Sequence, residues 1–188
     1  MKTNFELKNT SLTDAVLITP FSVDDNRGNF TKDFLKSFYN SNNLDCNLSE
    51  TFYAKNINKN TIRGMHFALK NPQAKVVKCI TGEIYDVIVD LRRKSPTYLK
   101  WEGFYLSEDN NLSLYVPKGF AHGYLVIKPG IVSYKCCGDY DPSYDTGVHY
   151  LDSTFNIKWP IKKEDNVIIS EKDNELKSYI DLKNLIEY

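Results

Sequence analysis

A succession of short apolar segments between residues 61 and 150, each bounded by turn-forming residues, constrains the fold of this chain most strongly. The segments are rich in Val, Ile, Tyr and Phe, which favour the pleated surface of a β-sheet. Turn signals such as Thr81-Gly82, Pro117-Lys118-Gly119 and Pro129-Gly130 separate them, and the first of these predicts a hairpin. Many short strands at this spacing are typical of a sandwich or a barrel. The strands are expected at residues 61–67, 74–80, 83–91, 98–106, 112–116, 122–127, 131–137 and 147–150.

Two further strands are expected before this β-rich region. Residues 14–22 contain a short apolar run, and residues 48–56 alternate in character. Because neighbouring side chains of a strand point to opposite faces, Phe52 and Ala54 should share one face and Tyr53 should lie on the other.

Helices are expected only near the two ends of the sequence. After a turn at residues 24–28, three phenylalanines recur at helical spacing and predict a short helix over residues 29–39. In the C-terminal tail, Ser170 begins a sequence suited to a helix N-cap, and an apolar stripe follows it. The expected fold is therefore mainly β, with a short N-terminal helix and a C-terminal helical tail.

Length and charge restrict the class of protein further. With 188 residues, 41% of them hydrophobic, the chain suits one well-packed domain that spans residues 1–188. The 24 Lys and Arg residues cancel the 24 Asp and Glu residues, so the chain lacks the basic field typical of proteins that bind nucleic acid or anionic membranes. An anionic ligand would have to be bound by locally placed cations.

No secretory leader or membrane-spanning run is evident, so a soluble cytoplasmic protein is expected. The four cysteines show no CxxC spacing, and we expect reduced thiols that fill space in the core. They are Cys46, Cys79, Cys136 and Cys137.

The three histidines are the first candidates for acid–base chemistry, because imidazole readily exchanges protons near neutral pH. His66 is the only histidine between Ile62 and Leu91, and it and His122 each follow a glycine closely in aromatic sequence. A buried histidine with a structural hydrogen bond is the alternative interpretation of both. His149 lies among Asp, Tyr and Gly residues, and we expect it to be structural or exposed.

A carboxylate interrupts the apolar strand expected at residues 83–91. Asp86 shares a face with Ile84 and Ile88, and an unpaired carboxylate in such a place would cost several kcal/mol. It should therefore pair with an imidazole or with a cation such as Lys75. A solvated position at a sheet edge is the alternative.

A bound transition metal is not expected. The run Pro117-x-Gly119-x-x-His122 matches the second metal-binding motif of cupin barrels, but the first motif needs an HxH pair followed by Glu. Here the positions two residues from His66 are Gly64 and Ala68. The set of metal ligands would be incomplete.

Several longer motifs carry a family resemblance. They are DDNRGNF (24–30), TIRGMHF (61–67), PQAKVVKCITGEIYDVIVDLRRKSPTY (72–98), LYVPKGFAHGYLV (114–126) and SYKCCGDYDP (133–142). Together with the later WP and ISEKD segments they closely resemble the dTDP-4-dehydrorhamnose 3,5-epimerase family, in matching order over most of the chain. The resemblance implies a cupin-like double-stranded β-helix (jelly-roll) barrel, a homodimer, and epimerisation of a nucleotide-linked 4-keto-6-deoxyhexose without a cofactor.

The same resemblance implies roles for individual residues. His66 corresponds to the base that removes the proton next to the ketone, Asp173 to the carboxylate that orients it, and Tyr134 to the acid on the opposite face. Lys75 would stabilise the charge of the enolate. Further pocket positions are matched by His122 and Asp86.

The nucleotide diphosphate has its own set of expected contacts. The resemblance points to Arg27 and Arg63, whose planar guanidinium groups suit phosphate oxygens, with Phe30 in the neighbouring pocket wall. Turn capping is the structural alternative for both arginines.

One segment departs from the family pattern. The rhamnose-pathway enzymes carry a QxN pair before the RG motif, and an alignment without gaps from Arg63 puts Thr51 and Tyr53 in its place. The family's Gln after HF is Ala68 here. These substitutions predict changed contacts to the substrate.

Several alternatives stay open at this stage. The chain could invert C3 only or C5 only, or it could accept a CDP- or GDP-linked deoxysugar. The deoxysugar 3,4-ketoisomerases are a further enzyme class, although the RGMHF and ISEKD motifs favour epimerisation. A non-catalytic barrel that binds sugar nucleotides is the alternative from a different class, and the joint presence of His66, Tyr134 and Asp173 argues against it.

Overall fold

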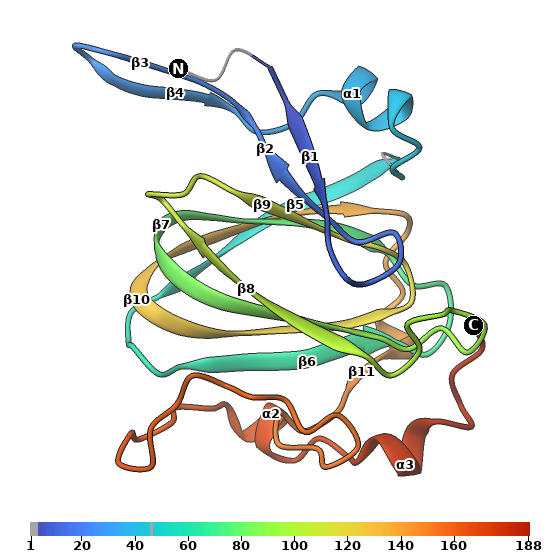
Figure 1. Ribbon diagram of the computed structural model, residues 1–188. Helices are drawn as coiled ribbons and strands as arrows, with labels where there is room; N and C mark the ends of the chain where they lie inside the picture. The colour runs from blue at the N-terminus through green and yellow to red at the C-terminus, as the bar shows by residue number, and fades with distance from the viewer. Residues whose placement is uncertain (1–3, 46) are drawn as a thin grey trace.

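Two long antiparallel strands organise the computed structural model, which describes residues 4–45 and 47–188. Strand β7 (Ala74–Asp90) pairs with β10 (Phe120–Cys137) from one end to the other. Four further strands of the described residues pair with these two directly and three more attach through those four, so this pair forms the centre of a nine-stranded sheet (Figure 1).

Each long strand changes partners halfway along its length. The first half of β7 pairs with β9 (Ser113–Val116) and its second half with β8 (Trp101–Ser107). The second half of β10 pairs with β5 (Leu48–Asn56) and its first half with β6 (Ile62–Ala68). The sheet therefore folds over on itself into a cupin-like jelly-roll barrel, as expected.

We call the two walls of this barrel the upper and lower half of the sheet, as they lie in Figure 1. The upper half contains β5 and β9, and it is extended by β2 (Val16–Thr19) and β1 (Glu6–Asn9). The lower half contains β6 and β8, and β11 (Asp145–Gly147) extends it next to β6.

Two glycines allow the long strands to bend together. Gly82 has a φ of +79°, and a Cβ atom there would lie 2.4 Å from the carbonyl oxygen of Pro129. At Gly130 a Cβ atom would lie 1.8 Å from the carbonyl oxygen of Thr81. The hairpin predicted at Thr81-Gly82 and the turn predicted at Pro129-Gly130 are therefore wrong. Both strands continue through a bend with shifted register instead of reversing direction.

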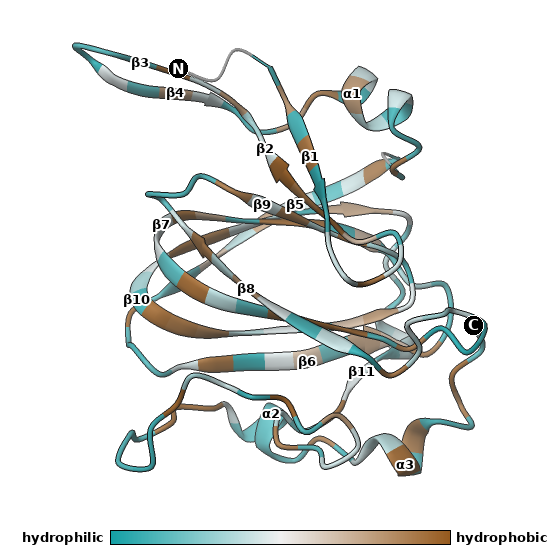
Figure 2. Ribbon diagram, viewed as in Figure 1, coloured by the Kyte–Doolittle hydropathy of each residue, from teal (hydrophilic) through white to brown (hydrophobic). Residues whose placement is uncertain are grey.

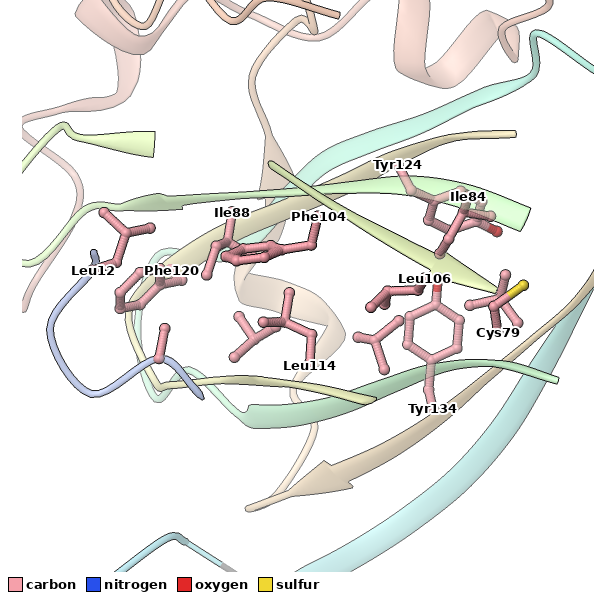
Figure 3. Packing of buried hydrophobic residues seen from close by; sticks show 14 of the residues in the cluster. Leu12, Cys79, Ile84, Ile88, Phe104, Leu106, Leu114, Phe120, Tyr124 and Tyr134 are labelled. Atoms are coloured by element: carbon pink, nitrogen blue, oxygen red, sulfur yellow. The ribbon is translucent and has the colours of Figure 1, made fainter. Parts of the chain in front are cut away.

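The main core lies between the two halves of the sheet (Figure 3). Ile84 and Ile88 point into it, whereas Val87 and Val89 pack on the outside against the C-terminal segment, which confirms the predicted alternation. Figure 2 shows apolar residues along β7, β9 and β10, and polar residues at the tip of the hairpin formed by β3 (Phe21–Asp25) and β4 (Gly28–Lys32).

The N-terminal helix begins later than predicted. Residues 28–32 form strand β4 (Gly28–Lys32), which pairs with β3 (Phe21–Asp25), and only α1 (Lys36–Ser41) is helical. The helical spacing of the phenylalanines misled because Phe30 packs across the hairpin against Phe21, with ring centroids 6.5 Å apart. The turn before it sets a hairpin register instead of starting a helix.

The C-terminal tail is less helical than predicted. It contains two one-turn helices, α2 (Glu171–Asn174) and α3 (Tyr179–Leu182). A 3₁₀ turn at Pro142–Tyr144 precedes β11 and lies before the tail. The Ser170 cap is confirmed, since its hydroxyl accepts a hydrogen bond from the backbone N–H of Asp173. The strand expected at residues 147–150 ends at Gly147.

Two sequence-based expectations concern the cysteines and the membrane. Cys79, Cys136 and Cys137 are buried thiols outside any disulfide, and Cys46 lies outside the described residues. Within the described chain, no helix has the length and apolar character needed to cross a membrane.

The contact between the two bends predicts the effect of a small substitution. Gly130→Ala should lower the free energy of unfolding by about 1–3 kcal/mol, because the new methyl group overlaps the Thr81 carbonyl. Chemical denaturation measures this change, and Lys128→Ala, beside the bend but with a side chain 60% exposed, is the control. Equal stability of the Gly130→Ala variant and the parent would contradict this account of the bend.

Candidate active site

A cavity of about 360 Å³ opens between the two halves of the sheet. Strands β5, β6, β7 and β10 and helix α2 contribute its lining. The lining residues are Phe52, Ala54, Arg63, His66, Lys75, His122, Gly123, Tyr124, Tyr134, Ser170, Lys172 and Asp173. Six of the predicted site residues, which are distributed over 111 positions of the sequence from Arg63 to Asp173, thus meet in one place.

His66 and Asp173 form a hydrogen-bonded pair at the edge of the cavity. Nε2 of His66 lies 2.9 Å from Oδ1 of Asp173, and the backbone N–H of Gly64 donates to Oδ2 of the same carboxylate at 3.0 Å. The histidine side chain is 33% exposed, whereas the carboxylate is 7% exposed. The imidazole can therefore meet a ligand, while its partner is held inside the protein.

Electrostatics fix the protonation of this pair. Burial acts to raise the pKa of Asp173, but the hydrogen bonds from His66 and Gly64 outweigh it, and the net shift is downward. An ionised carboxylate only accepts hydrogen bonds, so Nε2 of His66 carries the proton between them. Nδ1 is then left with a lone pair, which is what a general base requires.

A second carboxylate–imidazole pair is buried in the lower half of the sheet. Nε2 of His122 lies 3.0 Å and 2.9 Å from the two oxygens of Asp86, and both residues are buried. Of the alternatives for Asp86, the pairing with an imidazole is confirmed; Lys75 is not its partner, and it does not lie at a solvated edge. Burial raises the pKa of Asp86, and the neighbouring His122 opposes that shift.

Tyr134 enters the cavity from the upper half of the sheet, on the second half of β10. Its ring stacks on Phe52 at a centroid distance of 4.7 Å and meets the His122 ring edge-on at 6.0 Å. Burial, followed by the nearby hydroxyl of Tyr124 and the charge of Asp86, raises the pKa of Tyr134 well above its usual value. The phenol is therefore protonated near neutral pH and able to give up a proton as an acid.

Lys75 lies on the first half of β7, in the upper half of the sheet, opposite Cys136 of β10. Burial raises the pKa of the Cys136 thiol to about 11, and the positive charge of Lys75 acts against that shift. Lys75 lines the main cavity, and with His122 it also lines a smaller space of about 30 Å³ next to Ala68. The Lys75 side chain therefore lies between the main cavity and the smaller space.

Arg63 marks the outer end of the cavity, and its partner was not predicted from the sequence. Its Nε donates to Oδ1 of Asn56 at 3.0 Å, and the hydroxyl of Tyr124 donates to the same oxygen at 3.2 Å. Asn56 is 4% exposed. In the sequence, Asn56 is only a polar residue at the end of an expected strand. That position does not indicate that its side chain contacts Arg63.

The assignment of Thr51 and Tyr53 to the positions of the family's QxN pair is wrong. Thr51 and Tyr53 are exposed, with Tyr53 at 72%, and neither lines the cavity. Their strand neighbours Phe52 and Ala54 line it instead. The alignment without gaps placed the polar pair one residue away from the inward face of β5.

Arg27 and Phe30 do not join the cavity of their own chain. They lie on the β3–β4 hairpin, which projects from the barrel in Figure 1. The Arg27 side chain is 86% exposed and pairs with Asp25 at 2.6 Å, and Phe30 is 63% exposed. Their predicted contact with the diphosphate is therefore not made within one chain.

The remaining candidates have structural surroundings. His149 is half-buried outside the cavity, its Nδ1 accepts from the backbone N–H of Leu151 at 3.3 Å, and its ring packs on Tyr150. Among the described residues, no group of three or more His, Cys, Asp or Glu side chains is placed to hold a metal ion.

Comparison with known proteins identifies what this chain resembles. Residues 9–181 match the family model described as dTDP-4-dehydrorhamnose 3,5-epimerase. The enzyme of that name from Methanothermobacter thermautotrophicus is 40% identical over 174 residues, which cover 92% of this chain and 94% of the relative.

Solved structures agree in fold over nearly the whole chain. The dTDP-6-deoxy-D-glucose-3,5-epimerase of Legionella pneumophila, in complex with dTDP-4-keto-L-rhamnose, gives a TM-score of 0.88 at 32% identity and covers 98% of this chain and 95% of its own. The Bacillus anthracis dTDP-4-dehydrorhamnose 3,5-epimerase, with TDP and PPi bound, gives 0.86 at 38% identity and covers 93% and 99%.

The lowered pKa of Asp173 predicts a dependence of stability on pH. A group with a depressed folded pKa stabilises the folded state above its unfolded pKa, and this contribution is lost as pH falls through the folded value. The parent should therefore be more stable than Asp173→Asn at pH 7, and the difference should shrink below about pH 4. Denaturation of both proteins across this range measures it, with the exposed Asp109→Asn as control. A difference in unfolding free energy between the two proteins that stays constant down to pH 3 would contradict the prediction.

Proposed function

The chain belongs to the dTDP-4-dehydrorhamnose 3,5-epimerase family, and on that premise we propose that it inverts C3 and C5 of a dTDP-linked 4-keto-6-deoxyhexose. One observation supports this function most directly. A hydrogen-bonded imidazole on the lower half of the sheet and a protonated phenol on the upper half line the same cavity.

The proposed reaction begins with removal of a proton next to the ketone. Nδ1 of His66 takes the proton from the carbon, and the electron pair of that C–H bond forms the enolate with its charge on the ketone oxygen. Asp173 stabilises the imidazolium through the 2.9 Å hydrogen bond. Lys75 supplies a positive charge for the enolate oxygen inside the barrel, where water screens it little.

Inversion follows when the carbon receives a proton from the other face. Tyr134 comes from the opposite half of the sheet, so its hydroxyl approaches the planar enolate from the side away from His66. The high pKa of this phenol supports the role, because the proton is present at neutral pH. Each inversion thus leaves a protonated His66 and a deprotonated Tyr134, which return to their starting states by exchange with solvent.

The anionic end of the substrate would lie at the mouth of the cavity. Arg63 is exposed there, and Lys172 of α2 lines the same opening with a side chain 72% exposed. Two cations at this end suit a diphosphate, whereas the interior holds the groups that move protons. The overall charge of zero makes this local concentration of positive charge the main attraction for the ligand.

The exposed hairpin supports the expected homodimer. Arg27 and Phe30 lie outside the cavity of their own chain on a projecting pair of strands. In the proposed dimer, this hairpin reaches the cavity of the partner subunit, where Arg27 binds phosphate and Phe30 covers the nucleotide. An exposed aromatic ring and an arginine beside it suit such a contact better than solvent.

Incubation in deuterated water tests the reaction and its substrate together. With the dTDP-linked 4-keto sugar, deuterium should enter at C3 and C5, and NMR should show the inverted product. Incorporation at one centre would identify a single-centre epimerase. A preference for a CDP- or GDP-linked sugar would show that the substrate carries a nucleotide other than dTDP. Binding without exchange for every nucleotide would favour a non-catalytic barrel over the proposal.

Two substitutions separate the base from the acid. His66→Asn should abolish deuterium exchange, because the substitution removes the imidazole that takes the proton. Tyr134→Phe should impair inversion more than exchange, since abstraction precedes protonation from the opposite face. Exchange by His66→Asn at the parental rate, or unimpaired inversion by Tyr134→Phe, would refute the corresponding role.

The hairpin gives a separate prediction about the dimer. Light scattering should show the parent as a dimer, and Arg27→Ala should weaken dTDP binding by about tenfold through loss of a charge-assisted hydrogen bond. The exposed Lys55→Ala, on the other face of β5 from the cavity, is the control. A monomer that binds dTDP equally well with and without Arg27 would contradict both the dimer and the role of the hairpin.

A further inference from the structure

A buried amide links the two ends of the cavity, and the reaction scheme above gives it no role. Oδ1 of Asn56 accepts from Nε of Arg63 and from the hydroxyl of Tyr124. Arginine has no acceptor, so the carbonyl oxygen of the amide must face it, and the two donors occupy both lone pairs of that oxygen. Nδ2 of Asn56 donates to the backbone carbonyl of Ala54 at 3.4 Å, which agrees with this orientation.

Tyr124 also lies beside the acid. Because Tyr124 donates its proton to Asn56, its oxygen is left to accept from Tyr134, which packs in the same core cluster and lines the same cavity. Figure 3 shows the Tyr134 ring directed from one wall of the core toward the wall that carries Tyr124. Tyr124 is 1% and Tyr134 is 8% exposed, so bulk water does not compete for these bonds.

We propose that Asn56 and Tyr124 are positioning residues that join the phosphate-binding end of the cavity to its acid. Asn56 fixes the plane of the Arg63 guanidinium, and Tyr124 fixes the hydroxyl of Tyr134. The inference rests on the proposed function, because it takes the roles of Arg63 and Tyr134 from there.

Asn56 and Tyr124 should affect different parts of the reaction, namely the binding of phosphate and the transfer of the proton. With Nε held by Asn56, Arg63 keeps its two terminal nitrogens for a phosphate, which binds best to a pre-oriented fork. Tyr124 restricts the position of the Tyr134 hydroxyl, and proton transfer is sensitive to such placement. Asn56 belongs to both bonds, so its loss should affect both ends.

A merely structural role predicts a different result. Removal of a buried hydrogen bond would then lower stability and reduce every step of the reaction alike. A positioning role predicts that ligand binding, proton exchange and inversion respond separately. The test therefore measures all three together with thermal unfolding.

Three variants separate the two bonds. Tyr124→Phe removes only the hydroxyl, so inversion should fall about tenfold while deuterium exchange into the recovered substrate and the affinity for dTDP stay at the parental level. Asn56→Leu has a similar volume but no acceptor; it should reduce inversion in the same way and also weaken dTDP binding about tenfold. Asn56→Asp keeps the acceptor oxygens and should restore both properties.

A double variant and a control complete the design. If the residues act in one line, Asn56→Leu combined with Tyr124→Phe should lose no more inversion than Asn56→Leu alone. Tyr115→Phe is the matched control, because it removes the hydroxyl of another buried tyrosine, one that accepts from the backbone N–H of Asp45. It should leave binding, exchange and inversion unchanged.

Specific outcomes would overturn the inference. Equal losses of exchange and inversion in Tyr124→Phe, additive losses in the double variant, or parental dTDP affinity in Asn56→Leu would each do so. If the parent neither exchanges nor inverts any keto sugar, the proposed function fails instead. The binding of dTDP to Asn56→Leu and Asn56→Asp then still decides whether Asn56 orients Arg63.

Discussion

The lateral pairing of β7 with β10 is the interaction on which the rest of this structure depends. Both strands bend at facing glycines, so one continuous ladder of backbone hydrogen bonds supplies both walls of the barrel. Lys75 and Tyr134 lie on the halves that form one wall, and Asp86 and His122 lie on the halves that form the other. Side chains that line the cavity from its two walls are therefore held by the same pair of strands, and His66 of β6 is joined to this pair through its register with His122 of β10.

Two carboxylate–imidazole pairs show how burial can give the same residue types different properties. Asp86 and His122 are both buried, although His122 lines the cavity, whereas the His66 side chain is 33% exposed and only its partner Asp173 is buried. The pKa of Asp86 is raised by burial, while that of Asp173 is lowered by its hydrogen bonds, including one from a backbone N–H. The open pair suits proton exchange with a ligand, and the closed pair suits support of the cavity floor.

The spacing of the strands predicted a sandwich or barrel because strand patterns are local, and the resemblance of the motifs around His66 and Tyr134 to a known family supplied most of the cavity residues. Prediction from the sequence failed where the deciding contact is distant or where two patterns coincide. The phenylalanines at helical spacing around Phe30 belong to a hairpin set by the preceding turn. On β5, alternation pointed to Phe52 and Ala54, and the alignment that favoured Thr51 and Tyr53 ignored it. Asn56 could not be found, because a strand residue becomes a partner of Arg63 only after β5 and β6 are placed.

The bond between His66 and Asp173 joins residues 107 positions apart, and Asp173 follows every barrel strand in the chain. Helix α2, which carries Asp173, contacts β6 through the hydrogen bond that the backbone N–H of Gly64 donates to the carboxylate. During synthesis, all strands that surround the cavity leave the ribosome before Asp173, the partner of His66. A barrel that has formed without the docked tail holds Arg63, the proposed phosphate-binding residue, but His66, the proposed base, lacks its carboxylate partner. On the proposed mechanism, the group that orients the base is therefore the last part of the site to be made, and activity would report that the barrel and its tail have both folded.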